Sequence, residues 1–175
     1  MSSTIPPNIP PKATTIQAPT PLTSITQTPT IFLSGYISHP DACWRNHLTT
    51  ALSHLPITIL NPLRRDWDST WKNSPSDPKF VEQTSWELEC LERADLVVVN
   101  FGSLTSAPIS LMEMGFALGM KKRVVVCCPE GYYYRGNVQV MCGRLGYEVF
   151  EGFEEFVGAV VRSMEGLVGK DALEE

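Results

Sequence analysis

The feature that most constrains the fold is a short apolar run, Leu96-Val-Val-Val99, bounded by the polar residues Asp95 and Asn100. Such a run has no polar side to face water, so residues 95–100 are expected to form a central strand covered on both faces. That environment is typical of a parallel sheet, whose strands are joined by long crossover connections. The chain is therefore expected to fold as an α/β protein.

The same alternation continues along the chain. Further strands are expected at residues 31–35, 57–60, 123–128 and 147–150. The spacing of apolar residues predicts helices at residues 41–54, 79–93, 109–120, 137–145 and 153–167. Strands that alternate with helices indicate right-handed βαβ units. We therefore expect a flavodoxin-like or Rossmann-like three-layer sandwich with a five-stranded parallel sheet.

The two ends of the chain differ from this pattern. Residues 1–29 contain seven of the 14 prolines and a single charged residue, Lys12. They lack hydrophobic periodicity and are expected to form a disordered Pro/Thr-rich tail. The folded domain is then expected at residues 30–168, followed by a short acidic tail at residues 169–175.

Composition excludes several classes of function. A net charge of −5 argues against nucleic-acid binding, which relies on basic patches. The sequence has no apolar run that approaches the ~20 residues of a membrane span. Five cysteines without CxxC spacing favour reduced thiols in a cytoplasmic protein. Neither a metal-ligand pattern of histidines and carboxylates nor a glycine-rich cofactor motif is present, so we expect no metal and no cofactor.

One carboxylate stands out among apolar residues. In the helix expected at residues 109–120, Glu113 is the only charged residue before the helix end, and helical spacing places it on one face with Ile109 and Phe116. Burying a carboxylate without a partner is strongly unfavourable, which favours a specific task for it. The alternative is an exposed glutamate at the edge of the helix. Because this helix follows the strand at residues 95–100, Glu113 is expected near the carboxyl edge of the sheet, where such folds bind ligands.

Other carboxylates are expected in the same region. They are Glu87, Asp66 and Asp68. Carboxylates around an apolar and aromatic pocket suit glycosyl transfer, because one attacks the anomeric carbon and another moves the proton of the leaving group.

Five segments, in this order, resemble the nucleoside 2-deoxyribosyltransferase family. They are Ile31-Phe-Leu-Ser-Gly35, Asn61-Pro-Leu-Arg-Arg-Asp-Trp67, Trp86-Glu-Leu-Glu-Cys-Leu-Glu-Arg-Ala-Asp95, Ser106-Ala-Pro-Ile-Ser-Leu-Met-Glu-Met-Gly115 and Pro129-Glu-Gly-Tyr-Tyr-Tyr-Arg-Gly-Asn137. The resemblance spans roughly residues 30–150. It implies a double displacement, in which a glutamate attacks C1′ of the sugar, displaces the base and forms a deoxyribosyl ester. A second base then takes the sugar. The family also implies a small nucleoside or nucleobase as the partner, and a homo-oligomer.

The resemblance assigns roles to individual residues. Glu113 matches the nucleophile of the family, and Glu87 matches an acidic residue that binds the base or protonates its ring nitrogen. Many members carry a polar or acidic residue six positions before the nucleophile, where this chain has Ala107. Ser106, next to it, is therefore a candidate substrate-binding hydroxyl.

The remaining candidates lie in loops. Trp67 and Asp66 are expected to bind the base by stacking and by accepting N–H bonds, although Asp66 could instead lie in a turn or pair with Arg64 or Arg65. Gly35 and Tyr36 are expected to let the sugar approach the backbone, or else to form a plain turn.

Three alternatives remain open at this stage. Asn137 could bind substrate or cap the helix that follows it. The same Glu113 chemistry with water as the acceptor would give a nucleoside or nucleoside-monophosphate hydrolase. A non-catalytic nucleotide-binding sensor is also compatible with Ala107.

Overall fold

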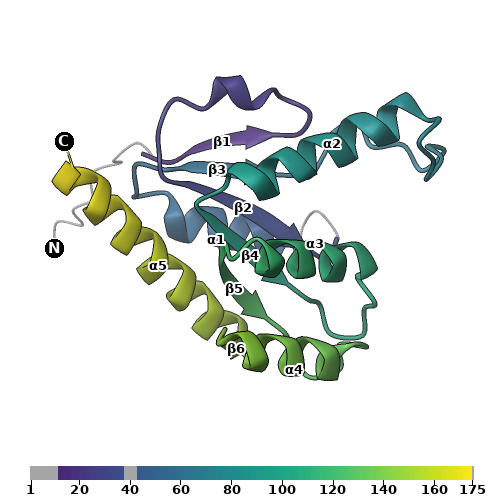
Figure 1. Ribbon diagram of the computed structural model, residues 1–175. Helices are drawn as coiled ribbons and strands as arrows, with labels where there is room; N and C mark the ends of the chain where they lie inside the picture. Colours follow the sequence, from purple (N-terminus) through teal and green to yellow (C-terminus); the bar gives the residue numbers. More distant parts are fainter. Residues whose placement is uncertain (1–11, 38–42, 175) are drawn as a thin grey trace, which may run out of the picture.

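The computed structural model describes residues 12–37 and 43–174, and within these ranges the chain forms one sheet of six strands (Figure 1). The strands are β1 (Thr14–Gln17), β2 (Thr30–Gly35), β3 (Thr58–Asn61), β4 (Leu96–Asn100), β5 (Arg123–Cys127) and β6 (Val149–Phe150). They lie in the order β1-β3-β2-β4-β5-β6, and each neighbouring pair is parallel.

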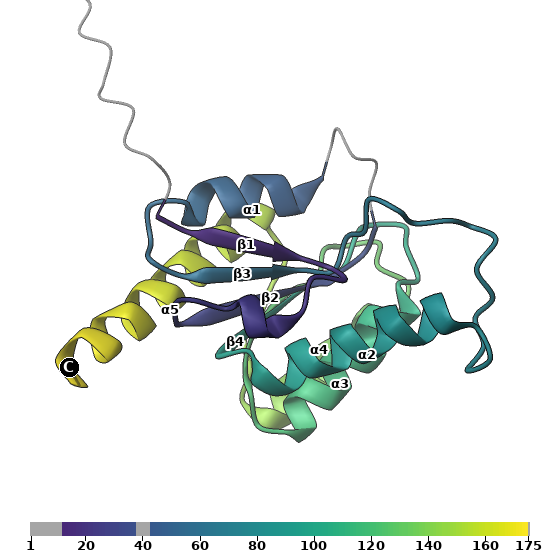
Figure 2. The ribbon, with the colours of Figure 1, turned by 90° about the horizontal axis from the view of Figure 1, so that it is seen from above.

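Helices cover both faces of this sheet. They are α1 (Trp44–Leu52), α2 (Pro78–Arg93), α3 (Pro108–Gly119), α4 (Arg135–Leu145) and α5 (Phe153–Glu174), with a short 3-10 helix, η1 (Leu22–Ser24). Helices α1 and α5 lie on one face, and α2, α3 and α4 lie on the other (Figure 2). The prediction of a flavodoxin-like α/β class with helix, sheet and helix layers is confirmed.

The central strand β4 shows why its sequence reads as uniformly apolar. Val97 and Val99 pack into the core under α2 and α3, whereas Leu96 and Val98 pack into the core under α1 and α5. All residues of β4 are buried, because successive side chains of a strand point to opposite faces and both faces are covered. The prediction for residues 95–100 is therefore confirmed.

The sheet has six strands rather than the expected five, and the additional strand comes from the segment assigned to a disordered tail. Strand β1 pairs with β3 at the edge of the sheet. The Gln27 side chain donates hydrogen bonds to the carbonyls of Lys12 and Ile57, which fastens this segment. The Trp86 indole of α2 donates to the Thr20 carbonyl at 2.7 Å. The prediction of disorder is thus wrong for residues 12–29, while residues 1–11 lie outside the described ranges.

Two helix boundaries also differ from expectation. Helix α5 continues to Glu174, so the expected acidic tail at residues 169–175 is helical over most of its length. Helix α1 begins at Trp44 and not at residue 41, and residues 38–42 lie outside the described ranges.

The carboxyl ends of the three central strands lie in one row. Gly35 of β2 pairs with Asn100 of β4, and Asn100 pairs with Cys127 of β5. The loops that follow these strands therefore meet at one edge of the sheet, which is where ligands bind in open parallel α/β folds.

Candidate active site

Glu113 lies on the inward face of α3 and is 8% exposed. The Ser34 hydroxyl, near the carboxyl end of β2, donates a hydrogen bond to Glu113 Oε2 at 2.5 Å. Helix α3 begins at Pro108, directly after Ala107 in the left-handed region (φ 33°), and this start turns the chain from the loop after β4 into the helix. The expectation that Glu113 is buried is confirmed, and its catalytic role remains a prediction.

Burial raises the pKa of Glu113 from its usual 4.5 to about 7. The hydrogen bond from Ser34 opposes this rise because it favours the ionised form, whereas the negative charge of Glu87 adds to it. The positive charge of Arg45 favours ionisation of Glu113. A carboxyl group with such a pKa exists in both protonation states near neutral pH, a property shared by many catalytic carboxylates.

Glu87 is the second candidate catalytic carboxylate. It lies on α2, is partly buried, and accepts a 2.7 Å hydrogen bond from Gln83 Nε2. Gln83 Nε2 also donates to the Pro62 carbonyl, and Gln83 Oε1 has no partner among the described residues. Burial raises the pKa of Glu87, and the charge of Arg45 lowers it. The positive charge of the buried Arg45 therefore favours ionisation of both Glu87 and Glu113.

Arg45 is that arginine, and sequence reasoning missed it. Its guanidinium group is buried and donates to three main-chain carbonyls at the end of β2, those of Leu33, Gly35 and Tyr36. Burial lowers the pKa of Arg45. One signal was available: a positive charge in the first turn of a helix is opposed by the helix dipole, so an arginine there indicates a task outside the helix.

Gly35 and Tyr36 complete the carboxyl end of β2. Gly35 has a positive φ of 152°, and an added Cβ would lie 2.5 Å from the Asn100 carbonyl oxygen and 2.7 Å from the Trp44 ring. Tyr36 stacks on Trp44 with ring centroids 6.5 Å apart. The Tyr36 ring also packs against Gly102, where an added Cβ would lie 2.9 Å from ring atoms of Tyr36. Glycine is therefore required at position 35 by close packing.

A cavity of about 530 Å³ opens at this edge of the sheet. Its lining combines aromatic and polar residues from the ends of β2, β4 and β5 and from α1 and α5, among them Tyr36, Trp44, His47, Asn100, Ser103 and Phe153. Glu113 does not line it. Tyr36, which lines the cavity, comes directly after β2, the strand whose Ser34 donates to Glu113.

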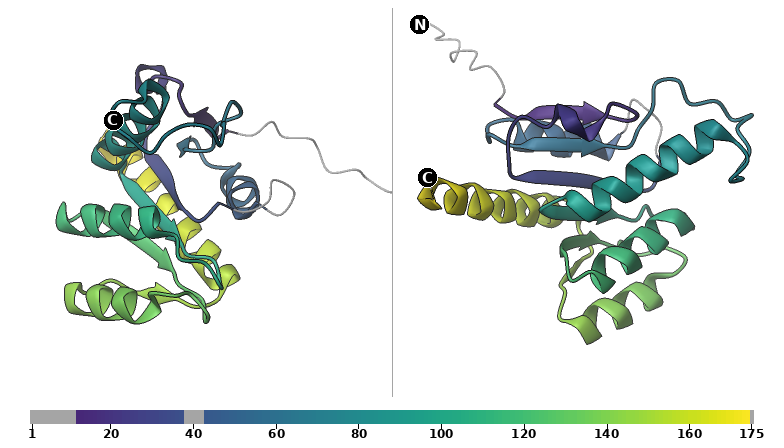
Figure 3. Two further views of the ribbon diagram at one scale, coloured as in Figure 1. Left: turned by 90° about the vertical axis from the view of Figure 1, so that its right-hand side faces the viewer. Right: turned by 45° about the horizontal axis from the view of Figure 1, so that its top comes forward.

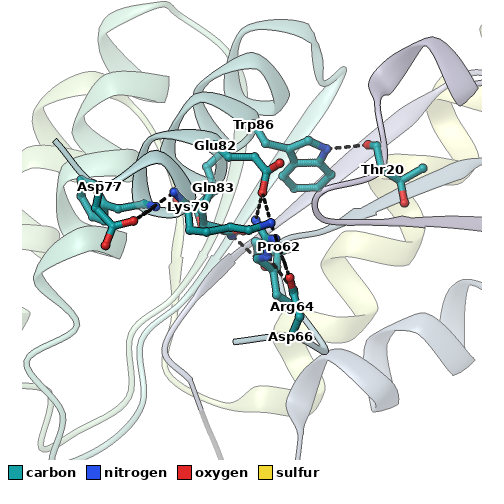
Figure 4. Close-up of polar contacts among 11 residues, drawn as sticks. Thr20, Pro62, Arg64, Asp66, Asp77, Lys79, Glu82, Gln83 and Trp86 are labelled. Atoms are coloured by element: carbon teal, nitrogen blue, oxygen red, sulfur yellow. Dashed lines mark hydrogen bonds and ion pairs between the residues drawn. The ribbon is translucent and has the colours of Figure 1, made fainter. Parts of the chain in front are cut away.

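Asp66 and Trp67 lie in the loop between β3 and α2 and are exposed. Two hydrogen bonds of 2.8 Å join the Asp66 carboxylate to Arg64, whose guanidinium also donates to Glu82 at 2.7 Å (Figure 4). This pairing lowers the pKa of Asp66 to about 2. The Trp67 ring contacts Trp71 edge-on, with centroids 5.0 Å apart. The structure thus shows the Arg64 pairing that the sequence left open, and a role of Asp66 and Trp67 in substrate binding remains a prediction.

Ser106 and Asn137 are both exposed. The Ser106 carbonyl accepts a 2.9 Å hydrogen bond from the Tyr132 hydroxyl. Asn137 is the third residue of α4, whose N-cap is Tyr134, so the alternative that Asn137 caps the helix is wrong. Within the described ranges, the structure shows no hydrogen bond from either side chain to the Glu113 group.

The comparison with protein families decides the family of this chain. A profile described as nucleoside 2-deoxyribosyltransferase like matches residues 28–132, which is more than half of the 175 residues. The chain belongs to this family. The matched range includes Ser34, Arg45, Glu87 and Glu113, and it excludes α4 and α5.

A solved structure at low sequence identity shows that the fold is shared and nothing more. A conserved protein from Enterococcus faecalis V583 has a crystal structure that superposes with a TM-score of 0.51 at 13% identity, covering 75% of this chain and 96% of that one. The TIR domain heterodimer of RPS4 and RRS1 gives a TM-score of 0.48 at 12% identity, covering 78% and 96%. The search of curated proteins finds no match.

Among the residues that the structure describes, no group of three or more histidine, cysteine, aspartate or glutamate side chains could hold a metal ion. A helix long and apolar enough to cross a membrane is likewise not found in that part of the chain.

Proposed function

We propose that the protein cleaves the N-glycosidic bond of deoxynucleosides and transfers the sugar to another base, with Glu113 as the nucleophile. The observation that carries the proposal is the buried Glu113 carboxylate, which accepts a hydrogen bond from Ser34 near the carboxyl end of β2. Membership of the family supports the class of reaction. A retaining glycosyl transfer also requires a second carboxyl group, and Glu87, whose pKa is raised by burial, is the candidate.

In the first step, the ionised Glu113 carboxylate attacks C1′ and forms a C1′–O bond while the C1′–N bond breaks. The departing base takes a proton from the carboxyl group of Glu87. This step requires that Glu113 is ionised and that Glu87 carries one proton when the substrate reacts.

In the second step, a ring nitrogen of the acceptor base attacks C1′ and displaces Glu113. Glu87 accepts the proton that this nitrogen loses, which restores the starting state of both carboxyl groups. Two inversions at C1′ give overall retention of configuration. If water replaces the acceptor base, the same two steps give hydrolysis.

Ser34 and Arg45 are proposed to keep Glu113 reactive. Both favour its ionised form, which is the form that attacks. We expect Ser34→Ala to raise the pKa of Glu113 and to move the rise of activity to higher pH, without a change of fold.

The test compares deoxyinosine alone with deoxyinosine plus adenine, followed by chromatography of the products. A transferase forms deoxyadenosine in the second mixture. We expect Glu113→Gln to lower the rate by roughly 10³-fold or more, and Glu92→Gln, at an exposed position on α2, to leave it unchanged. Equal release of free base and sugar in both mixtures would establish the hydrolase. If the native chain binds deoxyinosine but neither it nor any variant turns it over, the protein is a non-catalytic nucleotide-binding sensor.

Two further expectations stay proposals. The five free cysteines are all buried, which supports work in a reducing compartment such as the cytoplasm. Self-association, implied by the resemblance, stays a prediction.

A further inference from the structure

Gln83 is a buried polar residue that the proposed mechanism leaves without a task. It lies on α2, one turn before Glu87, and is 7% exposed. Helix α2 begins beyond the carboxyl ends of the strands and runs back across the sheet, so Gln83 lies nearer to that edge than Glu87 does (Figures 1 and 3). Its amide nitrogen, Nε2, donates to the Pro62 carbonyl at 2.9 Å and to Glu87 Oε1 at 2.7 Å. Gln83 therefore joins the loop after β3 to the second candidate carboxylate.

The Pro62 carbonyl fixes the orientation of the Gln83 amide. A main-chain carbonyl only accepts hydrogen bonds, so it pairs with Nε2 and not with Oε1. Gln83 and Pro62 lie close together in Figure 4. Rotation of the amide by half a turn would turn Oε1 toward the Pro62 oxygen and would break the hydrogen bond between them. The N–H group of Gln83 is thus held toward Glu87.

This contact distinguishes the two oxygens of the Glu87 carboxyl group. In a neutral carboxyl group, one oxygen carries the proton and the other is the carbonyl oxygen, which is the better acceptor. Because Oε1 accepts from Gln83, the proton of neutral Glu87 is on Oε2. Within the described ranges, no group donates a hydrogen bond to Oε2. Oε2 is therefore the oxygen that can give a proton to a substrate.

The other end of the Gln83 amide argues against a purely structural role. Gln83 Oε1 is buried and has no hydrogen-bond partner among the residues that the structure describes. A buried acceptor without a donor destabilises a fold, and an apolar side chain of similar length, such as methionine, would avoid that cost. The N–H group that Gln83 offers to Glu87 is what an apolar side chain could not supply.

We propose that Gln83 is a positioning residue for Glu87, which holds the acidic proton on Oε2 and orients it toward the departing base. This inference rests on the proposed function. As the C1′–N bond breaks, its electron pair goes to the base, and a ring nitrogen of the base takes the proton from Oε2. The bond between C1′ and Glu113 forms in the same step, and Glu87 is left ionised with Oε1 still bound to Gln83.

The charges around Glu87 set the sign of a pH effect. Burial raises the pKa of Glu87, whereas the Gln83 hydrogen bond and the charge of Arg45, on α1, lower it. The charge of Glu87 also acts on Glu113, on α3, and on Cys90, on α2 itself, whose thiol has a pKa raised by burial. Removal of the Gln83 donor should raise the pKa of Glu87 further, so Glu87 should stay protonated to higher pH.

The test compares Gln83→Met with the native chain on two substrates, with release of base followed within one turnover. Deoxyinosine needs a proton on its departing base, whereas the cationic base of 7-methyl-2′-deoxyguanosine leaves as a neutral molecule without one. We expect Gln83→Met to slow release of hypoxanthine by about tenfold or more and to leave release of 7-methylguanine unchanged. The fall of hypoxanthine release at alkaline pH should move to higher pH. Gln139→Met, at an exposed position on α4, is the matched control and should behave as the native chain does.

Two further measurements separate positioning from loss of the fold. If Gln83 acts through Glu87, adding Gln83→Met to Glu87→Gln should slow hypoxanthine release no further. In the native chain, the side-chain N–H resonance of Gln83 should move as Glu87 ionises, and this movement should be absent from Glu87→Gln.

The outcomes distinguish this inference from the proposed function. A native chain that cleaves neither substrate would overturn both. If the native chain cleaves deoxyinosine and Glu113→Gln does not, three results would overturn the role of Gln83 alone: equal slowing of both substrates by Gln83→Met, an additive loss in the double variant, or a Gln83 resonance that does not change with pH.

Discussion

Replacing the buried Glu113 by glutamine should stabilise the protein at alkaline pH. The pKa of Glu113 rises from 4.5 in the unfolded chain to about 7 in the fold, because burial disfavours the charged form. A rise of this size corresponds to roughly 3 kcal/mol of unfolding free energy. Glutamine keeps the shape of the side chain and an oxygen that can accept the Ser34 hydrogen bond, and it never ionises.

The sign follows from where the proton is bound. Below pH 4.5, Glu113 is protonated in both the folded and the unfolded state, so its burial does not lower the free energy of unfolding. Between pH 4.5 and about 7, the unfolded chain releases the proton while the folded protein keeps it, so the free energy of unfolding falls as pH rises. Above about pH 7, Glu113 is ionised in both states and the free energy of unfolding falls no further on its account. The advantage of Glu113→Gln over the native chain should therefore grow across this window by roughly 3 kcal/mol.

The assay is urea unfolding of both proteins at pH values from about 4.5 to about 8.5. Glu92→Gln, which removes an exposed carboxylate from α2, should stay within about 0.5 kcal/mol of the native chain at every pH. If the difference between Glu113→Gln and the native chain does not change with pH, the burial argument for Glu113 is refuted.

Three other predictions follow from contacts in the structure. Gly35→Ala should destabilise the fold by about 2 kcal/mol or more in urea unfolding, because the new Cβ would lie 2.5 Å from the Asn100 oxygen. Gly115→Ala, which meets no atom within 4 Å, should instead be neutral or stabilising. Trp86→Phe loses the hydrogen bond to the Thr20 carbonyl and should cost about 1 kcal/mol, whereas no loss would mean that the N-terminal segment does not pack there. The five buried thiols should resist a thiol reagent in the native protein and react after unfolding; rapid native labelling would contradict their burial.

The strands that the sequence predicts best are those whose apolar runs report burial directly. Leu96 to Val99 has no polar side, so its place in the middle of the sheet follows from composition alone. Strand β1 was missed because Ile16 is its only buried residue and because the hydrogen bonds that hold its segment join it to Ile57 and Trp86, which are distant in sequence. A sequence alone does not tell which distant residues will become hydrogen-bond partners of this segment.

The candidate site shows the same limit. A single carboxylate among apolar residues predicts the burial of Glu113, but a helix that is apolar on all sides does not reveal which side faces the core. Ile109 and Phe116 were therefore placed on the wrong face. Arg45 was missed because its partners are main-chain carbonyls, which every sequence contains.

The claim that Glu113 forms a covalent bond to the sugar is tested most directly by trapping that bond. The full chain is incubated with a deoxynucleoside without an acceptor base, quenched in acid within one turnover, digested and examined by mass spectrometry. We expect one added deoxyribosyl group on the peptide that contains Glu113, and none in Glu113→Gln. An adduct on another residue, or release of base by Glu113→Gln at the native rate, would contradict the account.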